Sequence, residues 1–108
     1  MINDLECKDA AIIAFLDRLT AAGCQWRLQD HWVGDLCAVG VSSLADPRVL
    51  AYVSSWGQPQ GSYHVELEAP ARDEEPYETV GVIDSAELVT AVRLVSQHLA
   101  TSVADPQN

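Results

Sequence analysis

Lysine and arginine are scarce in this sequence. The chain has 6 of them against 16 aspartates and glutamates, which gives a formal net charge of −10. A surface of this charge repels phosphate backbones and anionic lipids, so neither nucleic acid nor a membrane is an expected partner. The acids suit a protein partner with a basic surface, although they also fit a role in solubility alone.

Long apolar runs are absent as well. The first residues, Met1 to Glu6, show neither the basic nor the apolar region of an export signal. No later run approaches the roughly 20 apolar residues that a membrane-spanning helix needs. We therefore expect a cytoplasmic protein.

Cysteines are few, odd in number and widely spaced. Disulfide frameworks usually show even counts and structural metal sites a close pair, so Cys7, Cys24 and Cys37 are predicted to be reduced thiols. A zinc site formed by Cys24, Cys37 and His31 across a hairpin is the weaker alternative. Glycine-rich phosphate loops and a G-x-S-x-G motif are also missing, so we expect no cofactor, no metal and no covalent catalysis.

The apolar pattern predicts an α+β fold. With 108 residues, 48% of them hydrophobic, the chain has the size of a single domain, residues 1–108, with a frayed tail at 101–108. Asp84 and Glu87 have the spacing of a capping box for the second helix. Helical and alternating periodicities predict this order: a helix over 9–22, strands over 24–28, 36–41, 49–53, 62–68 and 77–83, and a helix over 85–100. The first hairpin should turn near Gly34, and short connections favour an antiparallel sheet of about five strands flanked by the two helices.

The fourth predicted strand has the clearest alternation. Tyr63, Val65 and Leu67 should face the core, which leaves His64, Glu66 and Glu68 on one outward face. An imidazole and two carboxylates in this arrangement are typical of a solvated or partner-contacting strand. They could also bind a metal or perform acid–base chemistry.

Acids concentrate between residues 66 and 87. This stretch holds 8 of the 16, namely Glu66, Glu68, Asp73, Glu74, Glu75, Glu78, Asp84 and Glu87. Aromatic residues lie near it, and aromatics beside acids are typical of an interface that meets a basic target. We predict a partner-binding surface formed by Trp56, His64, Glu66, Glu68, Asp73, Glu74, Glu75, Tyr77 and Glu78.

The segment from Gly61 to Glu68, followed by the final helix at Glu87 and Leu88, resembles the small acidic immunity proteins of bacterial polymorphic and contact-dependent toxin systems. The resemblance implies an α+β toxin inhibitor that neutralises a toxin domain by direct binding. Type III secretion chaperones are an alternative, but their pattern has a further helix between strands for which this chain has no obvious room. A small enzyme or enzyme subunit using His64, Glu66 and Glu68 is the alternative of another class.

Overall fold

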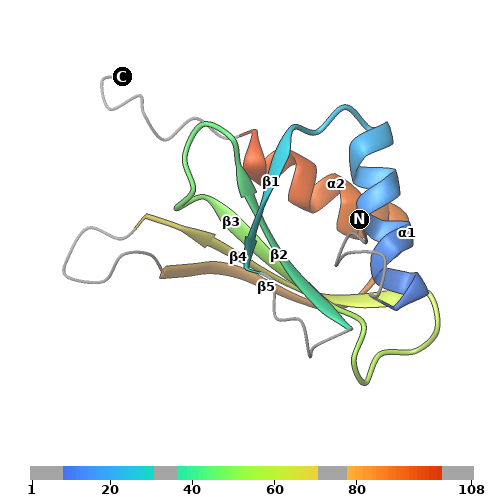
Figure 1. The fold of residues 1–108 in the computed structure, drawn as a ribbon. Coiled ribbons are helices and arrows are strands. Elements are labelled where there is room, and N and C mark those ends of the chain that lie inside the picture. Colours follow the sequence, from blue (N-terminus) through green and yellow to red (C-terminus); the bar gives the residue numbers. More distant parts are fainter. Residues whose placement is uncertain (1–8, 31–36, 71–77, 101–108) are drawn as a thin grey trace.

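A five-stranded antiparallel sheet carries both helices on one face (Figure 1). The computed structural model describes residues 9–30, 37–70 and 78–100. The elements are α1 (Ala10–Ala21), β1 (Trp26–Asp30), β2 (Ala38–Ser43), β3 (Leu50–Ser54), β4 (Ser62–Ala69), β5 (Glu78–Glu87) and α2 (Leu88–Leu99). The predicted α+β class and element order are therefore confirmed. The expected turn near Gly34 and the tail 101–108 lie outside the described residues.

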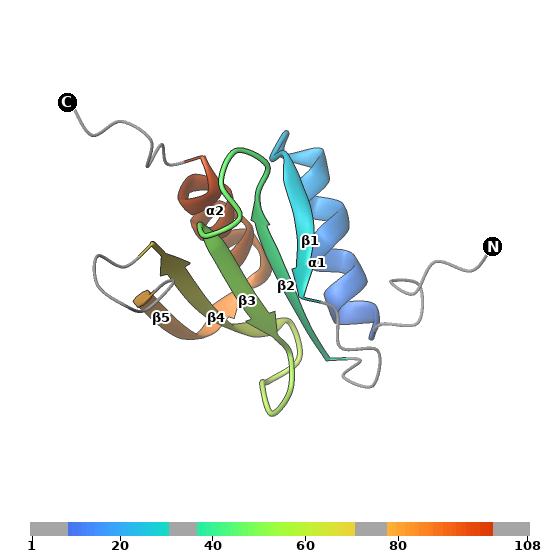
Figure 2. The same cartoon turned by 60° about the vertical axis from the view of Figure 1, so that its left-hand side comes forward.

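The strands follow one another across the sheet in chain order. Each pairs antiparallel with its neighbour in sequence, in the order β1-β2-β3-β4-β5 (Figure 2). Gly57 and Gly61, with φ of 71° and 85°, provide the left-handed backbone conformations of the connection between β3 and β4. Strands β1 and β5 are consequently the two edges of the sheet.

The core lies between the sheet and the helix layer. Helix α1 contributes Ile12, Phe15 and Leu19, whose spacing places them on one side of the helix. Tyr63 of β4 packs against Phe15, with ring centroids 5.8 Å apart, and its hydroxyl donates to the carbonyl oxygen of Ala11 at 2.7 Å. Helix α2 covers neighbouring strands with Ala91, Val92, Val95 and Leu99. None of the described helices is long and apolar enough to cross a membrane.

The start of α2 differs from the prediction. Strand β5 continues to Glu87 and the helix begins at Leu88, so Asp84 belongs to a strand and the predicted capping box is wrong. Glu87 occupies the N-cap position without a side-chain hydrogen bond. An irregular register between β4 and β5 lies beside this segment, where Ser85 has a φ of 59°. Strand β5 accommodates this irregularity and continues past Asp84, where the sequence predicts that the helix begins.

Candidate functional site

The face of the sheet opposite the helices, which we call the open face, carries the predicted strand surface. On β4, Tyr63 and Val65 are buried in the core, whereas His64 and Glu66 are only partly buried and project to the other side. The alternation predicted for this strand is confirmed. Glu68 continues the same row by its position two residues further along.

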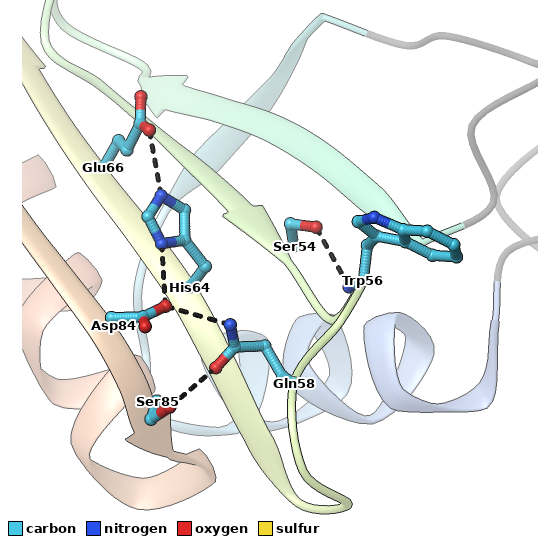
Figure 3. Close-up of polar contacts among 7 residues, drawn as sticks. All are labelled: Ser54, Trp56, Gln58, His64, Glu66, Asp84 and Ser85. Atoms are coloured by element: carbon cyan, nitrogen blue, oxygen red, sulfur yellow. Dashed lines mark hydrogen bonds and ion pairs between the residues drawn. The ribbon is translucent and has the colours of Figure 1, made fainter.

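His64 is the centre of a polar network on the open face (Figure 3). Its Nε2 lies 2.9 Å from Glu66 Oε2, and its Nδ1 lies 3.1 Å from Asp84 Oδ1 on β5. Gln58, from the connection between β3 and β4, donates through Nε2 to the same Asp84 oxygen at 2.9 Å. Ser85 donates to Gln58 Oε1 at 3.0 Å. The network thus joins β4, β5 and the turn that precedes β4.

Two carboxylates favour the charged form of this histidine. Ionised carboxylate oxygens only accept hydrogen bonds, so both contacts form together when each ring nitrogen carries a hydrogen. The hydrogen bond to Glu66 raises the pKa of His64 above its usual value; partial burial opposes this shift, and the bond to Asp84 adds to it. The hydrogen bond from His64, followed by that from Gln58, lowers the pKa of Asp84.

The geometry of the network does not suit chelation. Glu66 and Asp84 approach opposite nitrogens of the imidazole, so the three groups do not converge on one point. Within the described residues no group of three His, Cys, Asp or Glu side chains could hold a metal ion. Among the described residues, Cys24 and Cys37 form no disulfide, and His31 lies outside the described part of the chain.

The network lies away from two hollows that the described residues form. Both His64 nitrogens are engaged by carboxylates, and the Asp84 side chain is 70% exposed. Two hollows of about 510 and 520 Å³ lie elsewhere, one where the ends of α1 and α2 approach the β2–β3 connection and one between the two helices. Neither is lined by His64, Glu66 or Asp84.

Apolar side chains are exposed beside these acids. Trp56, just after β3, is 78% exposed, and its ring points away from the His64 network (Figure 3). Its backbone N–H donates to Ser54 Oγ at 3.1 Å, which fixes the chain at the point where the ring projects. On β5, Val82 lies beside Glu66 and is 57% exposed. An aromatic ring and a branched aliphatic side chain therefore remain available to a partner.

Of the remaining residues predicted to form the site, the structure describes only Glu78. Glu78 is exposed at the start of β5, where it pairs with Ala69 of β4. Asp73, Glu74, Glu75 and Tyr77 lie outside the described residues.

Sequence reasoning did not include Gln58, Val82, Asp84 and Ser85 in the site. Only the spacing of Val82 and Asp84, two residues apart in a β-type run, could have indicated a shared strand face.

We call Trp56, Glu66, Glu68, Val82 and Asp84 the acidic face. These residues come from β4, β5 and the segment that follows β3, and two of them, Glu66 and Asp84, contact His64. Comparison with known protein families, with curated proteins and with solved structures finds no match for the chain. The chemistry of this face is therefore the guide to what the protein binds.

Proposed function

We propose that this protein is a binding module that captures a basic protein partner through the acidic face, in the manner of an immunity protein that blocks a toxin domain. The observation that carries the proposal is the composition of β4 and β5. Together they hold Glu66, Glu68, Glu78, Asp84 and Glu87 and contain neither lysine nor arginine. Carboxylates beside exposed apolar side chains, on strands without lysine or arginine, are the chemistry of a surface that meets a basic target.

The two kinds of side chain have separate tasks in this proposal. Carboxylates at the rim attract a basic partner over distances of about 8–10 Å and raise the association rate. Exposed aromatic side chains such as Trp56 become anchors when a partner desolvates them, and anchors mainly determine how slowly a complex dissociates. His64 holds Glu66 and Asp84 in position through two hydrogen bonds.

An enzymatic use of the same residues has less support. General acid–base catalysis needs an imidazole nitrogen within reach of the substrate, whereas both His64 nitrogens already contact carboxylates. Binding sites for small molecules are usually concave, and the two hollows described above lie away from this network. Binding of a protein partner, by contrast, does not require a concave site.

The test measures binding to basic proteins encoded by neighbouring genes, a secreted toxin above all. The association rate should fall as salt rises. Trp56→Ala should mainly accelerate dissociation, and Glu68→Gln together with Asp84→Asn should mainly slow association. Asp17→Asn is the matched control, because Asp17 is exposed on α1 and lies away from the open face. A partner whose binding ignores both salt and these variants would contradict the proposal.

A further inference from the structure

Strand β5 is an open edge of the sheet. It is last in the strand order and pairs with β4, and no other described strand lies along its outer side (Figure 2). With ten residues it is also the longest strand. Such an edge presents backbone N–H and C=O groups that a further strand can bind.

Two exposed valines mark this edge. Val80 is 53% exposed and Val82 is 57% exposed, both close to the shift in register between Leu67 and Glu68. Proteins commonly protect edge strands with lysine or proline, and β5 contains neither. Valine is a strong β-former that gains from a cross-strand neighbour, so this edge has the composition of a pairing strand.

We infer that β5 accepts an extended segment of a basic partner as an additional antiparallel strand, centred on Val82. The inference rests on the proposed function and specifies how the partner binds. Backbone hydrogen bonds would hold the segment, and every second side chain of the segment would contact residues of the open face. An apolar residue beside Val82 and a lysine or arginine two positions away, beside Asp84, would match the valine and the exposed carboxylate.

Charge selects this occupant over a second copy of the chain. Each β5 carries Glu78, Asp84 and Glu87 and no lysine or arginine. Pairing two copies would therefore bring together three carboxylates from each strand without a compensating base, and like charges across strands are destabilising. A basic segment instead meets Asp84, which is 70% exposed, and Glu66 beside Val82.

A short capped peptide, acetyl-Thr-Lys-Thr-Val-Thr-Lys-Thr-amide, tests the inference. It presents lysine, valine and lysine on one face of a strand. In a titration of the isotope-labelled full chain, amide shifts should centre on Val82, and hydrogen exchange of β5 amides should slow. The same peptide with its valine and both lysines N-methylated keeps the charge and side chains but loses the donors that face β5, and it should bind about ten-fold more weakly or not at all.

A pair of variants locates the binding strand. Val82→Ala should weaken peptide binding about two- to five-fold, because it removes a cross-strand contact. Val89→Ala is the matched control, since Val89 on α2 is 58% exposed and lies outside the sheet. Circular dichroism of both variants checks that the fold is kept.

The outcomes separate the inference from the proposed function. Equal, salt-sensitive binding of both peptides would overturn strand addition while supporting capture of basic partners by the acidic face. Shifts centred on β1, the other edge, would overturn it as well. Binding of neither peptide would also overturn strand addition, whereas the proposed function would still be decided by the partner measurements above.

Discussion

At the scale of single residues, His64 illustrates how a surface strand places an imidazole between two carboxylates. Glu66 lies two residues away on β4, and Asp84 reaches the other ring nitrogen from β5. The arrangement couples two neighbouring strands through one titratable group. It should therefore leave a signature in the pH dependence of stability.

The raised pKa of His64 stabilises the fold below about pH 6.5, and this contribution is lost as pH rises through the raised value. The lowered pKa of Asp84 stabilises the fold above about pH 4, and this contribution is lost as pH falls through the lowered value. The difference in unfolding free energy between the protein and His64→Gln should thus be largest between about pH 4 and 6.5. Urea unfolding over a pH series measures it. A difference that grows from pH 6.5 upwards would contradict this assignment.

The residues of the site were predictable to different degrees. Strand alternation was enough to place His64 and Glu66 on one face, and the position of Trp56 beside Gly57 indicated an exposed ring. The contacts of Asp84 and Gln58 depend on the register of β4 against β5, which includes a shift between Tyr63 and Val65. Pairing irregularities of this kind have no signature in a single sequence.

At the scale of elements, the junction of β5 and α2 shows where local patterns mislead. Asp84 and Glu87 have capping-box spacing, but pairing with β4 continues through Ala86 and Glu87. Ladder hydrogen bonds along this stretch keep Asp84 in a strand, and its carboxylate binds His64 instead of a helix N-terminus. Tertiary pairing thus overrides a local helix-start signal, while the apolar stripe of α2 was predictable because it repeats over three turns.

The uncapped start of α2 leads to a prediction. Glu87 has φ of −70° and ψ of 162°, the extended conformation of an N-cap residue, but its side chain makes no capping hydrogen bond. Aspartate is a preferred N-cap residue with a shorter side chain, so Glu87→Asp should stabilise the protein by about 0.5–1 kcal/mol. Chemical denaturation measures the gain. Glu87→Ala is the control and should give none; an equal gain from alanine would assign the effect to removal of the glutamate side chain and would contradict capping.

At the scale of the whole molecule, the excess of acids is the dominant property. Sixteen acids and six bases give the net charge of −10, and like charges in a compact protein repel one another. Surface ion pairs, such as the one between Arg48 and Asp46, reduce this repulsion only slightly. The fold therefore carries a self-repulsion that salt can screen.

Thermal stability should consequently rise with salt. Increasing sodium chloride from about 20 to 300 mM shortens the screening length to below about 10 Å and should raise the melting temperature at neutral pH. The variant with Asp73, Glu74 and Glu75 replaced by their amides is the control, because it should begin more stable and gain less. A melting temperature that falls with salt in both proteins would show that attractive ion pairs outweigh the repulsion.

The order of the elements also has a consequence for biosynthesis. Every strand pairs with its neighbour in the chain, so the sheet can assemble hairpin by hairpin while the ribosome extends it. Helix α2 follows all five strands, yet it supplies Ala91, Val92, Val95 and Leu99 to the core. Until α2 has been made, the sheet surface that it covers stays open to water, and the nascent chain carries apolar surface that chaperones recognise and that favours aggregation.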